Sequence, residues 1–176
     1  MNRRTDMETI EMFERRIGWT WVAGLAVLLV VTAAQATTHP KKTVAESLVE
    51  LYVPMQEALA GDSVAGVREQ VAKIGAAAAA IAGAKGEPAL SAAVEVVAIA
   101  ARGMTATDVE GLRVQFKPLS RGLALLVEKQ AVAGRGIYYC PMVDAYWIQK
   151  SGEVRNPYFG KQMLTCGELV TKVGEG

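Results

Sequence analysis

Residues 43–60, TVAESLVELYVPMQEALA, predict the fold, because their apolar side chains recur every three or four positions. This spacing places those side chains on one face of a helix. Thr43 and Glu46 have the spacing of a capping box, in which each side chain accepts a hydrogen bond from the other residue's backbone N–H. The sequence therefore predicts a helix that begins directly after Thr43.

The same periodicity continues in residues 64–81, 88–101 and 109–126, with breaks at residues 61–63 and 86–88. Four helices joined by short connections are typical of an antiparallel bundle. We therefore expect an all-α fold whose apolar stripes form the core.

Two local signals concern the fourth predicted helix. Thr107 and Glu110 have the spacing of a second capping box at its start. Pro118 lies inside the helix and predicts a kink or a break near Lys117.

Residues 137–167 differ in composition from the rest, since aromatic, proline and glycine residues are concentrated there. Proline and glycine argue against a continuous helix. We expect an aromatic, Cys/Met-rich loop or hairpin on the bundle, with residues 151–152 closing a hairpin between residues 146–149 and Val154. Residues 164–172 are expected to form a short terminal helix.

The N-terminal region has the pattern of an export signal. An uncharged apolar run, residues 17–34, follows several arginines and ends beside the small residues of an A-x-A site. We predict a signal peptide over residues 1–36, a flexible mature N-terminus over 37–42 and one domain over 43–176. The expected location is the periplasm, with no stable membrane span after cleavage. The alternative is an uncleaved segment that anchors the protein to the inner membrane.

Composition excludes several classes of function. The formal net charge is +1 and no basic patch is present, which argues against nucleic-acid binding. His39 is the single histidine, so a Ser-His-Asp or Cys-His centre in the core is not expected. We expect a protein that is not an enzyme.

His39 gives one further hypothesis. Cleavage after Ala36 would leave a chain that begins Thr37-Thr38-His39, whose amine, two amides and imidazole form a square-planar site for Cu(II) or Ni(II). The alternative is a coincidence at a disordered terminus.

Both cysteines lie near the end of the chain, each close to a methionine: Cys140 with Met142, and Met163 with Cys166. Thiolate and thioether are soft ligands and favour Cu(I) or Ag(I), and Trp147 is a candidate cation–π partner. The alternative is a disulfide that closes a loop of about 26 residues, worth roughly 3 kcal/mol in the chain-entropy model. In that case both methionines belong to the core.

Further polar and aromatic residues surround the sulfur residues. Gln149 and Asn156 are expected to make loop hydrogen bonds. Tyr146, Tyr158 and Phe159 are candidates for a docking surface. They support the alternative function, a disulfide-stabilised helical interaction module of the cell envelope without a metal.

The C-terminal region resembles an exported bacterial domain family of unknown function. The resemblance depends on C-P-M, W-x-Q, N-P-Y-x-G and M-x-x-C-G motifs, which begin here at Cys140, Trp147, Asn156 and Met163. Four residues of the fourth predicted helix also resemble the family: Arg113, Phe116, Leu119 and Ser120.

That family also occurs at the C-terminus of some periplasmic adaptor proteins of copper/silver efflux pumps. The resemblance implies an association with metal efflux and no settled activity. Together with the four sulfur residues, it leads us to expect a non-enzymatic periplasmic protein that binds Cu(I) or Ag(I) in copper/silver homeostasis or efflux. It also implies that an efflux-system or other envelope protein is a partner.

Overall fold

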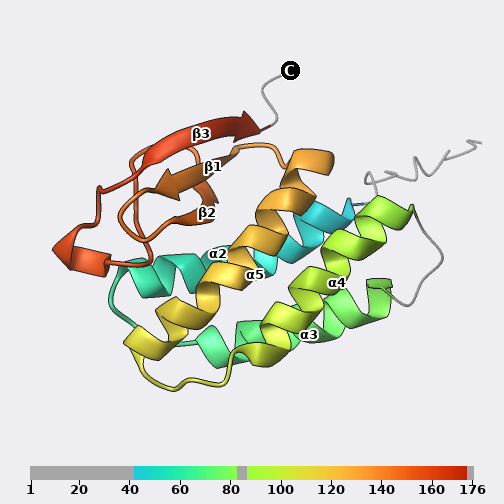
Figure 1. The fold of residues 1–176 in the computed structure, drawn as a ribbon, viewed down its shortest axis with the longest axis horizontal. Helices are drawn as coiled ribbons and strands as arrows, with labels where there is room; N and C mark the ends of the chain where they lie inside the picture. Colours follow the sequence, from blue (N-terminus) through green and yellow to red (C-terminus); the bar gives the residue numbers. More distant parts are fainter. Residues whose placement is uncertain (1–41, 83–86, 174–176) are drawn as a thin grey trace, which may run out of the picture. The chain divides into compact units, whose positions relative to one another are not determined.

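The computed structural model describes residues 42–82 and 87–173. Within these residues lie four helices, a three-stranded sheet and a short 3-10 helix (Figure 1). In chain order these are α2 (Val44–Ala60), α3 (Val67–Ala82), α4 (Pro88–Gly103), α5 (Val109–Lys129), β1 (Arg135–Cys140), β2 (Ala145–Lys150), η1 (Gly160–Gln162) and β3 (Glu168–Val173).

The sheet shows that the predicted all-α fold and helical bundle are wrong. Its strands are antiparallel in the order β2-β1-β3, so the fold mixes helices with a sheet. Residues 141–144 close the hairpin, and not residues 151–152. Residues 168–173 form β3 instead of a terminal helix. Gly167 has a φ of +134°, a backbone conformation that cannot continue a right-handed helix.

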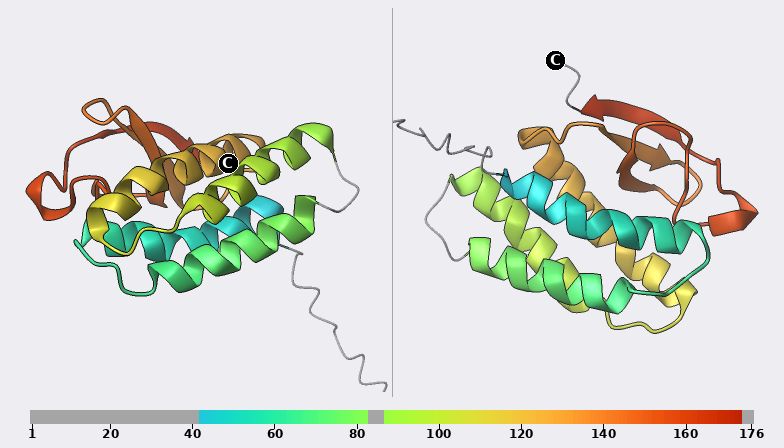
Figure 2. Two further views of the ribbon diagram at one scale, coloured as in Figure 1. Left: turned by 60° about the horizontal axis from the view of Figure 1, so that its bottom comes forward. Right: turned by 180° about the vertical axis from the view of Figure 1, so that it is seen from behind.

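The helices and the sheet form successive layers. The α3 and α4 helices pack on each other, α2 and α5 lie against them, and the sheet covers α2 and α5 through β2 (Figures 1 and 2). Tyr52 of α2 stacks on Phe116 of α5, with ring centroids 4.9 Å apart, and Trp147 of β2 is fully buried. The residues that follow helix α5 therefore fold onto the helices as a layer of their own.

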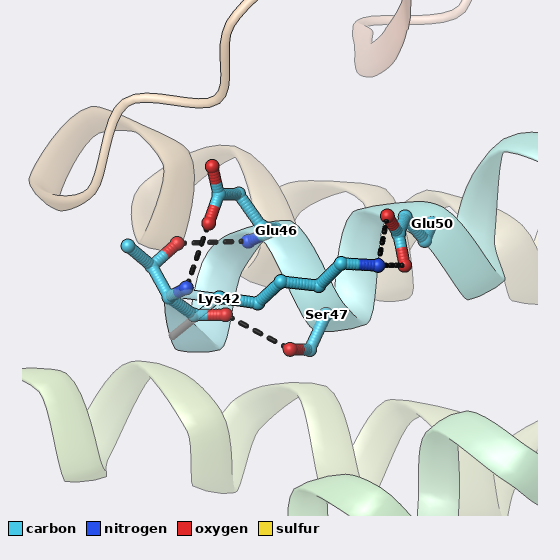
Figure 3. A network of polar contacts seen from close by, with 5 residues as sticks. Lys42, Glu46, Ser47 and Glu50 are labelled. Carbon is cyan, nitrogen blue, oxygen red and sulfur yellow. Dashed lines mark hydrogen bonds and ion pairs between the residues drawn. The ribbon is translucent and has the colours of Figure 1, made fainter. Parts of the chain in front are cut away.

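The predicted start of α2 is confirmed. The Glu46 amide donates to Thr43 Oγ1 over 3.1 Å, and the Thr43 amide donates to the Glu46 carboxylate over 2.7 Å (Figure 3). The second predicted box is wrong, because the N-cap of α5 is Asp108 and not Thr107. The Asp108 carboxylate accepts a hydrogen bond from the Gly111 amide over 2.8 Å.

The predicted break near Lys117 does not occur, since α5 runs from Val109 to Lys129 through Pro118. Proline removes the hydrogen bond to the carbonyl four residues earlier, here that of Val114. Both residues lie on the exposed side of α5, and Val114 is 67% exposed, so water can replace the lost hydrogen bond.

Candidate functional site

The two cysteine side chains meet at one end of the sheet. Cys140 is the last residue of β1, and Cys166 lies two residues before the start of β3. Strands β1 and β3 are antiparallel neighbours, so the two residues lie at the same end of the sheet. The two Sγ atoms are 3.6 Å apart, and both cysteines are free thiols. The structure thus brings together the two thiols that the sequence singled out.

The two thiols differ in their surroundings. Cys140 is fully buried in the core, whereas Cys166 is half-buried at its edge. The hydrogen bond with Cys140, followed by burial, raises the pKa of the Cys166 thiol above its usual value. The Cys166 thiol is therefore a weaker acid in the fold than a free cysteine.

The two methionine side chains lie in different environments. Met142 lies in the β1–β2 turn and is 63% exposed. Met163 is half-buried, and its carbonyl accepts the Cys166 amide over 3.0 Å in a tight turn. The expectation that Met142 belongs to the core, if the cysteines form a disulfide, does not fit this exposure.

Trp147 and Gln149 of β2 are both buried, and their side chains contact each other and neighbouring parts of the sheet layer. The Trp147 ring stacks on Tyr138, with centroids 5.5 Å apart, and its Nε1 donates to Gln149 Oε1 over 2.8 Å. The same oxygen accepts the Arg155 amide over 2.9 Å, and Gln149 Nε2 donates to the Glu153 carbonyl over 2.7 Å. Gln149 therefore fastens the loop after β2 to the sheet.

Asn156 connects this loop to the thiol site. It is fully buried, its Nδ2 donates to the Cys166 carbonyl over 2.6 Å, and its Oδ1 accepts the Tyr158 amide over 2.8 Å. Its own amide donates to the Leu164 carbonyl over 2.7 Å. One side chain thus fixes the backbone of Cys166.

The three proposed docking aromatics have different environments. Tyr158 is buried between Phe116 and Trp147, its hydroxyl donates to the Tyr146 carbonyl, and burial raises its pKa. Tyr146 is 39% exposed, and Phe159 is half-buried beside a hollow of about 360 Å³. Tyr158 therefore cannot serve as an exposed docking residue.

A second anchor, which the sequence did not reveal, holds the other end of this loop. Arg113 of α5 donates to the Pro157 carbonyl over 2.9 Å, to the Leu59 carbonyl over 2.8 Å and to Asp62 over 2.6 Å. Asp62 also accepts the Lys161 amide over 3.2 Å. The resemblance included Arg113, but nothing in the sequence pointed to Asp62.

The Asp62 contacts predict a response to acid. The Arg113 hydrogen bond, together with that from Lys161, holds the pKa of Asp62 below its usual value. A carboxylate with a lowered folded-state pKa stabilises the fold above its unfolded pKa near 4, and this contribution is lost as the pH falls through the folded value. Between about pH 5 and about pH 3, the melting temperature of the wild type should fall more than that of Asp62→Asn. Parallel curves from circular dichroism would contradict this prediction.

The predicted N-terminal features, including His39 and the signal peptide over residues 1–36, lie outside the described residues. Within residues 42–82 and 87–173, no three His, Cys, Asp or Glu side chains gather to hold one metal ion. None of the helices in that part of the chain has both the length and the hydrophobicity of a membrane span.

Comparisons with protein-family models, with curated proteins and with solved structures found no match to this chain. The resemblance to the exported domain family therefore stays a prediction from the sequence.

Proposed function

We propose that this domain binds a soft metal ion, Cu(I) or Ag(I), between Cys140 and Cys166, as part of an exported protein of copper or silver handling. The observation that supports the proposal best is the 3.6 Å separation of the two Sγ atoms. Metal–thiolate bonds of about 2.3 Å place two sulfurs on one ion roughly 3.8 Å apart at a tetrahedral angle. The two thiols therefore need little movement to share an ion.

The ligand types favour a soft ion. Two thiolates with thioethers nearby in the chain suit Cu(I), whereas hard ions prefer oxygen ligands. Met142 exposes 63% of its surface, so packing does not explain a large apolar residue at this turn. The proposed further ligands are the thioethers of Met142, two residues after Cys140 in the sequence, and Met163, three residues before Cys166.

Hydrogen bonds of the backbone hold the two cysteines of the proposed site in position. Cys140 is held by the central strand β1, and Cys166 by the Asn156 side chain. Binding would replace the two thiol protons by the ion, since only the thiolate coordinates a metal. Holding both sulfurs in place beforehand reduces the ordering cost of binding.

The alternative function, an interaction module that docks through aromatic residues, has less support. Tyr158 and Trp147 are buried and hold the sheet on the helices. Tyr146 and Phe159 alone keep exposed ring surface among the aromatic residues proposed for docking.

The proposal predicts how substitutions change Cu(I) affinity, measured on the reduced full-length chain by competition with a chromogenic Cu(I) chelator. Cys140→Ser and Cys166→Ser should each weaken affinity by more than about 100-fold, since even groups outside the coordination sphere are worth roughly 10–100-fold. The double variant Met142→Leu, Met163→Leu should weaken it by roughly tenfold. Reducing conditions leave the predicted Cu(II) site at His39 out of the measurement.

A second measurement keeps the metal proposal separate from folding effects. Cu(I) should protect both thiols of the wild type from alkylation and raise its melting temperature, because a ligand that binds the folded state stabilises it. Zn(II) should protect much less, because structural zinc sites use four Cys or His ligands. Equal alkylation with Cu(I), with Zn(II) and without metal would overturn the proposal.

A further inference from the structure

The thiol pair has a feature that metal binding does not require: only one of its two cysteines is partly exposed. Cys140 is fully buried and belongs to the core together with Trp147 and Tyr158. Cys166 is half-buried and packs against that core from its edge. A reagent from solution therefore has access to Cys166 before Cys140.

The backbone on both sides of the pair is fixed. Cys140 pairs with Ala145 at the end of the β1–β2 ladder. Cys166 is held by its amide on the Met163 carbonyl and by its carbonyl on Asn156. Gly167 then lies so close to the Trp147 ring that a Cβ atom would overlap the indole, so the chain cannot move closer to the ring at this point.

This geometry favours bond formation between the sulfurs. A disulfide has an S–S distance of about 2.05 Å, and the Sγ atoms start 3.6 Å apart. Side-chain rotation can close much of this gap while the strands stay in register. Groups held in contact react with each other at a high effective concentration.

From this asymmetry we infer that Cys140 and Cys166 form a dithiol–disulfide exchange site for small disulfides, with Cys166 reacting first and Cys140 resolving. The Cys166 thiolate attacks one sulfur of the small disulfide, forms a mixed disulfide and releases the other half as a thiolate, which takes up the proton from Cys166. The Cys140 thiolate then attacks Sγ of Cys166, and the second half of the small disulfide leaves and takes the proton from Cys140. Two protein thiols are oxidised to one disulfide, and one small disulfide is reduced to two thiols. Metal binding plays no part in these steps.

The test uses oxidised glutathione as the small disulfide, in buffer with a metal chelator and with the full-length reduced chain. The wild type should lose two hydrogens in mass without accumulating a glutathione adduct. Cys140→Ser, which lacks the resolving thiol, should accumulate one adduct on Cys166. Cys166→Ser should form its adduct on Cys140 at least roughly tenfold more slowly, because access controls the rate of exchange.

A control on the unmutated protein avoids folding artefacts of the substitutions. Brief alkylation of the reduced wild type with limiting iodoacetamide, followed by peptide mass mapping, should label Cys166 well before Cys140. Cys140→Ala, checked by circular dichroism, should give the same adduct as Cys140→Ser. Equal labelling of the two thiols in the wild type would overturn the order of reaction. A wild type that retains both thiols under conditions that modify Cys140→Ser would overturn the exchange site itself. Because no metal is present, neither result depends on the proposed metal function.

Discussion

Gly160→Ala is expected to lower the free energy of unfolding by about 3 kcal/mol, although the substitution adds a single methyl group. Gly160 has a φ of +56°, in the left-handed region. A Cβ atom at this position would overlap the Asp62 carboxylate and the Arg113 guanidinium. The methyl group must therefore displace Arg113 or Asp62, the two side chains that bind residues 157–161 to the helical part of the fold.

Two costs combine in this prediction. A left-handed conformation costs a residue with a Cβ atom roughly 1–2 kcal/mol relative to glycine. Displacing Arg113 also leaves the Leu59 and Pro157 carbonyls without their donor. A buried polar group that loses its partner costs about 1–3 kcal/mol.

Two other glycines allow the cost of the left-handed conformation to be measured by itself. Gly66 and Gly134 have φ values of +72° and +68°, and a Cβ atom at either position would meet nothing within 4 Å. Gly66→Ala and Gly134→Ala should therefore each cost only about 1 kcal/mol. The comparison is made by urea unfolding of all three variants, with the slopes checked for equality. A Gly160→Ala loss no larger than that of the two controls would show that Arg113 can move freely.

The helical half of the fold was predictable because its signals are local. A capping box such as Thr43 with Glu46 satisfies backbone groups within three residues, and amphipathic periodicity extends over several turns in each helix. The start of α5 shows the limit of such signals. Thr107 and Asp108 are both good N-cap residues, and only the structure shows that Asp108 caps the Gly111 amide.

The sheet was missed for a physical reason. A half-buried strand shows alternating polarity, but β1 is the central strand, and consecutive residues such as Ile137 and Tyr138 are both buried. Its pairing with β3 joins residues about 30 positions apart, which no local pattern reports. Residues 164–172 have an apolar pattern that fits either state, and the sheet contacts together with Gly167 favour the strand.

The candidate site was predictable in part. Two cysteines in one chain made their proximity a natural expectation, and the sulfurs do lie close together. The polar residues of the motifs were harder to interpret, because a motif does not show whether a side chain faces a ligand or the backbone of the protein itself. Gln149 and Asn156 use their amides on loop backbone groups, so these two motif residues hold the site in place.

Asn156→Ala is expected to lower the free energy of unfolding by about 3 kcal/mol and to loosen Cys166. The Asn156 side chain is fully buried and joins the Cys166 carbonyl to the Tyr158 amide. Its removal leaves the buried Tyr158 amide and the partly buried Cys166 carbonyl unpaired, and a buried group without a partner costs about 1–3 kcal/mol. Alkylation of Cys166 should become faster than in the wild type, because its backbone is no longer fixed.

Asn156→Asp separates the two hydrogen bonds, since a carboxylate still accepts from the Tyr158 amide but cannot donate to the Cys166 carbonyl. At neutral pH the buried charge next to a carbonyl oxygen should make this variant at least as unstable as Asn156→Ala. Burial raises the pKa of a carboxyl group, and the protonated form can donate a hydrogen bond. The free energy of unfolding that Asn156→Asp loses relative to the wild type should therefore become smaller as the pH falls from about 7 to about 5. The loss in Asn156→Ala should stay constant over this range. A deficit that does not change with pH in either variant would mean that the hydrogen bond to Cys166 adds little to the stability of the loop.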